Sequence, residues 1–220
     1  MKSHAPLEFE MHVPGDVVEG APVAVLLHGR GSHRGDLQGL RPGLPPGMVV
    51  VTPEAPHPGA PWGYGPGWAW YRYAGQDRVA SETLLRSLES LDVFLDGLPG
   101  RLPVAPGPVL LGGFSQGGTT SLAYALTRPG RVAGVLNFSG FLVDDDAVPV
   151  TPASVADTPI FWGHGVADPN IPFSLAETGR ARLAEAGAAM ETRDYRIGHW
   201  IDAGELEDAR RWMEGVVAPR

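Results

Sequence analysis

Cysteine is absent from this chain of 220 residues, and Lys2 is the single lysine among its 17 basic residues. Without cysteine the protein has no disulfide bond, no thiolate metal site and no cysteine nucleophile. One lysine leaves almost no candidate for a Schiff base or for a serine–lysine mechanism. No apolar run of the sequence approaches the roughly 18 residues of a membrane-spanning helix, so we expect no membrane partner.

Positive charge is scarce and dispersed. The 17 basic residues compare with 25 acidic ones, which gives a net charge of −8. No segment gathers basic residues, and this argues against nucleic acid and against anionic membrane surfaces as partners. Residues 1–8 hold one positive charge and no apolar stretch, so we expect no signal peptide and a cytoplasmic location. The length and the hydrophobic fraction of 43% suit a single domain over residues 1–220.

Predicted strands and helices alternate along the chain. Apolar and polar residues alternate over 7–13, as in an edge strand, and the apolar runs at 22–27 and 48–51 are typical of strands covered on both faces. Further strands are predicted at 108–111, 132–138, 159–162 and 192–197. Helices are predicted at 77–96, 118–126, 174–187 and 205–217, the third with a capping box of Ser174 and Glu177. This order predicts the α/β class, with a mainly parallel sheet and helices on both faces. No insertion is long enough for a large lid domain, so we expect none.

The sequence Gly113-Phe114-Ser115-Gln116-Gly117 fits the G-x-S-x-G pattern of a nucleophile elbow. It lies between the strand predicted at 108–111 and the helix predicted at 118–126, which is the context that this motif needs. A serine on such a turn has a strained backbone, and the two glycines leave room for it. We therefore predict that Ser115 is a catalytic nucleophile at a helix N-terminus.

A serine hydroxyl needs an adjacent base, and histidine is the usual one. In folds with this elbow, the acid and then the histidine follow the serine along the chain. Of the seven histidines only His164 and His199 come after Ser115, and only His199 leaves a plausible acid ahead of it. We therefore predict His199 as the base and interpret His164 as a turn residue.

Asp168 is the preferred acid because it follows the strand predicted at 159–162 and would leave the carboxyl edge of the sheet, where ligands and chemistry collect. Its carboxylate would accept the Nδ1–H of His199. The alternatives are the three adjacent acids at 144–146, which more often form a solvated loop. Asp194 is a poor candidate because it lies within a predicted strand.

An oxyanion hole is expected to combine two backbone N–H groups. One is that of Gln116, directly after the nucleophile. The other comes from the glycine-rich loop after the strand at 22–27, where the Arg30 amide is the preferred donor. We expect His28 to order this loop through hydrogen bonds and to take no proton from the substrate.

These motifs together resemble the phospholipase/carboxylesterase branch of the α/β-hydrolases, which includes small bacterial carboxylesterases and acyl-protein thioesterases. The resemblance covers about residues 20–215 and rests on four motifs in the family's order: Leu27-His28-Gly29-x-Gly31, Gly113-Phe114-Ser115-Gln116-Gly117-Gly118, His164-Gly165-x-x-Asp168-x-x-Ile171-Pro172 and Gly198-His199. It implies an α/β-hydrolase fold and a triad of Ser115, Asp168 and His199 that uses no metal or other cofactor. A monomer or homodimer is expected by the same analogy.

The resemblance implies a serine carboxylesterase that hydrolyses small carboxylic esters through an acyl-enzyme intermediate. A thioesterase or lysophospholipase would use the same groups, and the sequence does not separate these activities. Peptidases of this fold tend to carry an extra domain or cap, for which no segment here is long enough. A non-catalytic binding protein is the alternative of a different class, although every catalytic group has a candidate in this chain.

The segment 53–75 is rich in proline, glycine and aromatic residues and is a candidate for the substrate site. Arg30 stands where many family members carry leucine, which could bring a charge to the rim of the cleft. The aromatic side chains expected to form walls of the substrate site are Trp62, Trp68, Trp70 and Tyr71, with Trp200 opposite. The alternative is that two or three of them fill the core.

Overall fold

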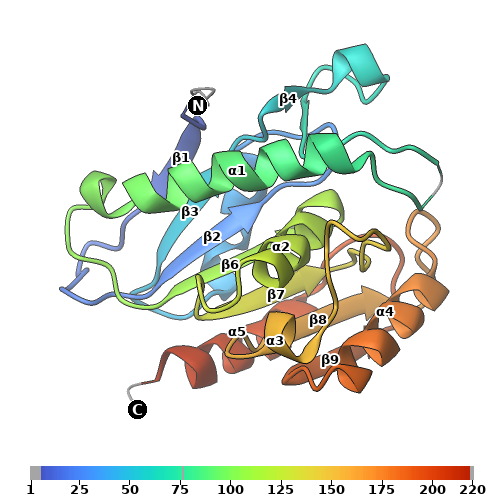
Figure 1. Ribbon diagram of the computed structural model, residues 1–220. Helices are drawn as coiled ribbons and strands as arrows, with labels where there is room; N and C mark the ends of the chain where they lie inside the picture. The colour runs from blue at the N-terminus through green and yellow to red at the C-terminus, as the bar shows by residue number, and fades with distance from the viewer. Residues whose placement is uncertain (1–5, 76, 219–220) are drawn as a thin grey trace.

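The computed structural model describes residues 6–75 and 77–218, which build a sheet of seven strands. β1 pairs antiparallel with β3 at one edge, and the other neighbouring strands are parallel. The expected mainly parallel sheet is therefore confirmed, with the first strand at an edge. The strands lie in the spatial order β1 (Phe9–His12), β3 (Val49–Pro53), β2 (Val23–Leu27), β6 (Val109–Phe114), β7 (Gly134–Phe138), β8 (Ile160–Gly165) and β9 (Met190–Tyr195) (Figure 1).

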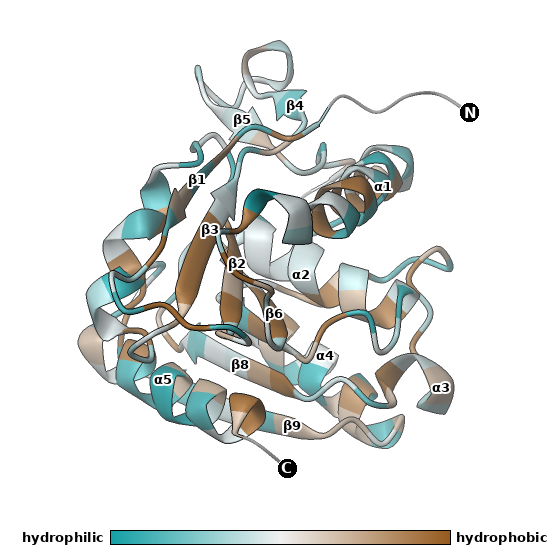
Figure 2. Cartoon of the chain, turned by 90° about the vertical axis from the view of Figure 1, so that its left-hand side faces the viewer, coloured by the Kyte–Doolittle hydropathy of each residue, from teal (hydrophilic) through white to brown (hydrophobic). Residues whose placement is uncertain are grey.

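Helices cover both faces of this sheet, and apolar strand residues lie between them (Figures 1 and 2). Alternate residues of β2 show the two cores: Val23 and Val25 pack in one, Ala24 and Leu26 in the other. Each large aliphatic side chain that is fully withdrawn from water contributes about 1.5–3 kcal/mol. The first core is shared with α1 (Ser81–Gly97), α2 (Gln116–Thr127), α3 (Pro152–Val155) and α4 (Phe173–Glu185), and the second with α5 (Ala203–Val217) and the 3₁₀-helix η1 (Asp36–Gly43).

The first long helix, α1, begins four residues later than the periodicity predicts. Tyr73 and Val79 form an isolated β-bridge, and the N–H of Ala80 donates to the Arg72 carbonyl at 2.8 Å. These backbone pairings keep Val79 in the bridge and Ala80 in an extended conformation, so helical hydrogen bonding starts at Ser81. The end of α1 is followed by the short 3₁₀-helix η3 (Pro99–Arg101).

The other predicted elements begin one or two residues away from their predicted starts, and α4 and β9 show why. α4 begins at Phe173 after Pro172, and the capping box predicted from Ser174 does not form. Proline at this position fixes a backbone conformation that leads into the helix without a side-chain cap. β9 begins at Met190, because its register is set by pairing along the whole of β8, from Ile160 opposite Met190.

The aromatic segment contains short regular elements that the sequence did not predict. β4 (His57–Pro58) and β5 (Trp68–Ala69) pair antiparallel around the 3₁₀-helix η2 (Ala60–Trp62), apart from the main sheet at the top of Figure 1. Between β7 and β8 the described chain forms only the short helix α3, so no large lid domain is present there. In the described ranges no helix has the length and apolarity to span a bilayer. Residues 1–5, on which the expectation about a signal peptide partly rests, lie outside them.

Candidate active site

Ser115 lies on a sharp turn between β6 and α2 and has the left-handed backbone angle φ of 55°. A Cβ on Gly113 would lie 2.5 Å from the carbonyl carbon of Gly117 and from the carbonyl oxygen of Leu27. A Cβ on Gly117 would overlap the Leu27 carbonyl as well. Both positions of the motif therefore need glycine, because the turn packs directly against the end of β2. This geometry presents the serine hydroxyl at the N-terminus of α2, as the motif predicts.

The structure brings Ser115, His199 and Asp168 together in one hydrogen-bonded chain. Nε2 of His199 lies 2.9 Å from Oγ of Ser115, and its Nδ1 lies 2.6 Å from Oδ2 of Asp168. Asp168 follows β8 and His199 follows β9, so both come from the carboxyl edge of the sheet. A carboxylate acceptor at Nδ1 assigns the proton of a neutral imidazole to that atom and leaves Nε2 to accept the serine proton.

The loop that carries Asp168 is held by its own backbone and by His164. Oδ1 of Asp168 accepts the N–H groups of Asn170 and Ile171 at 2.8 and 2.9 Å. His164 is fully buried in β8, where burial lowers its pKa, and the Nε2–H of the neutral ring donates to the Ile171 carbonyl at 3.0 Å. His164 thus supports the acid loop from within a strand, although the sequence had placed it in a turn.

Three of the four other acids considered from the sequence are engaged elsewhere. Asp144 pairs with Arg182, and Oδ2 of Asp145 accepts the hydroxyl of Ser81. Asp194 lies inside β9, as predicted, and pairs with Arg180. Across residues 6–75 and 77–218 no group of three or more histidine, aspartate or glutamate side chains is arranged to hold a metal ion.

The two amides expected in the oxyanion hole lie on segments that meet at Ser115. A Cβ on Gly29, next to Arg30, would lie 3.8 Å from Cβ of Ser115. In the described part of the chain neither the Arg30 N–H nor the Gln116 N–H donates to a protein acceptor. The Gln116 amide is in the first turn of α2, where the helix dipole also favours negative charge. Both groups are therefore available to an oxyanion.

His28 orders the loop before Arg30. Burial lowers its pKa to about 4, against the opposing effects of the Gly29 carbonyl and of Asp36. In the neutral ring Nδ1–H donates to the Gly29 carbonyl at 2.7 Å, and Nε2 accepts the Ala55 N–H at 3.1 Å. With both nitrogens occupied, His28 holds two loops together and has no free position for proton transfer.

The side chain of Gln116 has a role that the motif did not indicate. Its Oε1 accepts the N–H of Trp70 at 2.8 Å, and its Nε2 donates to the Tyr71 carbonyl at 2.7 Å. Trp70 and Tyr71 are fully buried, and the indole N–H of Trp70 donates to the His28 carbonyl at 3.0 Å. A fully buried glutamine signals that such partners exist, but their identity follows only from the fold.

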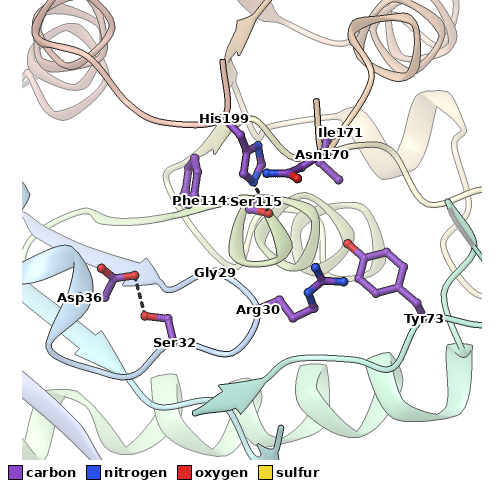
Figure 3. A pocket seen from close by; sticks show the side chains of 10 residues that line it. All are labelled: Gly29, Arg30, Ser32, Asp36, Tyr73, Phe114, Ser115, Asn170, Ile171 and His199. Carbon is purple, nitrogen blue, oxygen red and sulfur yellow. Dashed lines mark hydrogen bonds between the residues drawn. The ribbon is translucent and has the colours of Figure 1, made fainter. Parts of the chain in front are cut away.

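A cavity of about 300 Å³ opens beside Ser115 (Figure 3). None of the five aromatic residues expected to form its walls is among the residues that line it. Trp70 and Tyr71 fill the core, the ring of Trp62 packs at 4.9 Å from that of His57, and Trp200 is 55% exposed. Tyr73, at the end of the same segment, lines the cavity instead. The lining residues are Gly29, Arg30, Ser32, Asp36, Tyr73, Phe114, Ser115, Asn170, Ile171 and His199.

Known proteins with similar sequences are named carboxylesterases or acyl-protein thioesterases. The family described as phospholipase/carboxylesterase matches residues 13–216. A probable inactive carboxylesterase of Oryza sativa subsp. japonica is 34% identical over 141 residues, 62% of this chain and 56% of the rice protein. Acyl-protein thioesterase 1 of Kluyveromyces lactis is 35% identical over 164 residues, 68% of this chain and 69% of that protein. The chain spans about half the length of the rice relatives that it matches.

A solved esterase structure has a similar fold. The crystal structure of esterase PE8 matches with a TM-score of 0.78 and 27% sequence identity, over 96% of this chain and 100% of that chain. Together with the parallel sheet and its helices on both faces, this likeness confirms the expected α/β-hydrolase fold.

Proposed function

The chain belongs to the phospholipase/carboxylesterase family, and from that premise we propose that it hydrolyses carboxylic esters with Ser115 as the nucleophile. The observation that carries the proposal is the arrangement of three side chains. Ser115 has a strained backbone, and its Oγ lies 2.9 Å from Nε2 of His199. Nδ1 of His199 lies 2.6 Å from Oδ2 of Asp168. Acyl transfer needs a nucleophile, a base and an acid that orients the base, and the contacts of Ser115, His199 and Asp168 support these roles for the three residues.

The reaction begins when Oγ of Ser115 attacks the ester carbonyl carbon and its proton passes to Nε2 of His199. The carbonyl oxygen becomes negative in the tetrahedral intermediate and accepts hydrogen bonds from the Gln116 and Arg30 amides. The buried carboxylate of Asp168 stabilises the imidazolium that forms. When the intermediate collapses, the bond to the alcohol breaks and His199 gives its proton to the leaving oxygen.

The acyl-enzyme is then hydrolysed by the same groups. His199 takes a proton from a water molecule, whose oxygen attacks the acyl carbonyl and forms a second tetrahedral intermediate. Collapse of that intermediate breaks the bond to Oγ, and His199 returns the proton to Ser115. The carboxylic acid leaves, and the triad is restored.

The cavity supports a preference for small esters. A volume of about 300 Å³ matches the lower end of small-molecule sites. The described chain between β7 and β8 adds no cover that would enclose a long acyl chain. A thioester would be cleaved by the same groups, and the relatives named acyl-protein thioesterase support this second candidate.

The proposal is tested by hydrolysis of p-nitrophenyl esters from acetyl to palmitoyl, and of matching acyl thioesters, by wild type and Ser115→Ala. Loss of a triad nucleophile lowers kcat on the order of a million-fold, so the variant is expected to be inactive on every substrate. A short optimum in wild type supports the small-ester proposal. Equal, negligible rates in both proteins, together with no labelling of Ser115 by a fluorophosphonate, would overturn it.

A further inference from the structure

The guanidinium of Arg30 is a charged group of the cavity, and the described residues give it no carboxylate partner. Its side chain is exposed and lines the same cavity as Ser115 and His199. Among the described residues no carboxylate lies within ion-pair distance of Arg30, whereas nine other arginines have such a partner. Arginine presents five N–H donors in a fixed plane that suits a carboxylate. Those donors are available to an anion that enters the cavity.

Aromatic rings fix the direction of this side chain. The guanidinium carbon lies 5.1 Å from the centre of the Tyr64 ring and 5.4 Å from that of Tyr73. Such cation–π contacts hold an arginine without neutralising its charge. The backbone N–H of Tyr73 donates to the Tyr64 hydroxyl at 2.8 Å, which ties the two rings together. The charge therefore has a defined place in the cavity, although the side chain reaches solvent.

Tyr73 offers a second donor beside the guanidinium. Its hydroxyl oxygen accepts the O–H of Tyr71 at 3.4 Å, which leaves its own proton to donate. Burial raises the pKa of Tyr73, so the group remains a neutral donor. Figure 3 shows the Tyr73 hydroxyl and the Arg30 guanidinium close together at one end of the cavity. One carboxylate at this position can accept from both groups.

The two ends of the cavity differ in charge. Figure 3 shows Asp36 at the end opposite Arg30 and Tyr73, where it accepts the hydroxyl of Ser32 at 2.7 Å. The carboxylate of Asp36 repels an anion from that end, and Arg30 attracts one to the other. An anionic group of a bound ester is thereby directed to one side of Ser115.

The position of His199 decides which part of the ester carries that group. Ser115 lies between His199 and Arg30 in Figure 3. The leaving alcohol must lie within hydrogen-bond reach of His199, which protonates it. The part of the substrate that extends toward Arg30 is then the acyl part.

We propose that the substrate of this enzyme is an ester whose acyl part ends in a carboxylate, and that Arg30 and Tyr73 bind this carboxylate. The chemical class is the monoester of a short dicarboxylic acid. This inference rests on the proposed ester hydrolysis at Ser115 and narrows its substrate. The Arg30 amide and side chain then act on the same acyl group, the first at its carbonyl oxygen and the second at its far end.

The test compares ethyl hydrogen succinate with ethyl 4-methylpentanoate, in which an isopropyl group replaces the carboxylate at the same distance from the ester. The readout is the ratio of the two kcat/KM values, from the ethanol released. We expect wild type to favour the anionic ester and Arg30→Gln, which keeps the amide, to lower the ratio on the order of tenfold. Tyr73→Phe keeps the ring and lowers the ratio by a few-fold.

Arg72→Gln is the matched control. It also removes one positive charge from this region, but Arg72 is paired with Glu82 and does not line the cavity, so the ratio should stay at the wild-type value. An unchanged ratio in Arg30→Gln would overturn the inference. So would a preference for 3-(butanoyloxy)propanoate, which carries its carboxylate on the alcohol side. If ethyl hydrogen succinate and ethyl 4-methylpentanoate are both cleaved in a Ser115-dependent way, the proposed ester hydrolysis stands even when this inference fails. If neither of these two esters is cleaved and a fluorophosphonate does not label Ser115, the proposed function itself fails.

Discussion

Glu205 is a buried carboxyl group whose titration should control the stability of the protein. It lies in the first turn of α5, is fully buried, and has no hydrogen-bond partner at either carboxyl oxygen among the described residues. Its side chain packs on β8, where a Cβ on Gly163 would lie 2.9 Å from its carboxyl carbon. A charged carboxylate in this place would be both desolvated and unpaired.

Burial raises the pKa of Glu205 from 4.5 to about 8, with a further rise from Asp202 and an opposing effect of Arg180. Between these two values the folded protein keeps a proton that the unfolded chain has lost. The stability that this proton carries is therefore complete below pH 4.5 and is lost as the pH rises through about 8. At about 1.4 kcal/mol per pH unit, the loss is at most about 5 kcal/mol over the whole range.

Glu205→Gln keeps the shape of the side chain and removes its titration. We would measure the free energy of unfolding in urea for both proteins at several pH values from about 5 to 8. Over that range the stability of wild type relative to the variant should fall by about 4 kcal/mol. Glu207→Gln is the control, because Glu207 is exposed on the same helix and Arg210 lowers its pKa, which leaves it ionised throughout. Parallel pH profiles of wild type and Glu205→Gln would refute the reasoning.

Two further substitutions test the site. Asp168→Asn should lower kcat by roughly ten-thousand-fold while leaving Tm close to that of wild type, because an amide at this position favours the wrong tautomer of His199; steady-state kinetics and a thermal scan check both parts. Gln116→Ala leaves the buried N–H of Trp70 and carbonyl of Tyr71 unpaired, which should cost about 2–5 kcal/mol and lower Tm by roughly 5–15 °C. A Tm within about 2 °C of wild type would show that this side chain does not hold the segment.

The positions of the three triad candidates could be predicted because each depends on local sequence. The glycines around Ser115 are required by a turn that only a small neighbour permits, and they occur between an apolar run and a helix. Asp168 and His199 each follow a predicted strand, and parallel strands bring their carboxyl ends to one edge. The structure places the three side chains in hydrogen-bond contact without any further assumption.

The walls of the cavity could not be predicted, because an aromatic side chain suits a core as well as a substrate site. Trp70 and Tyr71 are buried because Gln116, about 45 residues later, fixes their backbone, and no local pattern reveals that pairing. The start of α1 was missed for a similar reason, since the bridge between Tyr73 and Val79 overrides the helical periodicity. In both cases the local sequence allows two structures, and hydrogen bonds to residues outside the local pattern decide between them.

Ser115 and the end of the cavity that holds Arg30 and Tyr73 are connected through a continuous series of contacts. The backbone of Gln116 follows Ser115, and its side chain holds Tyr71 at the carbonyl. The Tyr71 hydroxyl donates to Tyr73, whose ring in turn contacts the guanidinium of Arg30. Arg30 closes the path, because its loop packs back against Ser115 through Gly29. A substrate carboxylate bound by Arg30 and Tyr73 would therefore act on groups that are fixed relative to the elbow, so its binding energy can be used to hold the ester carbonyl between the nucleophile and the two amides.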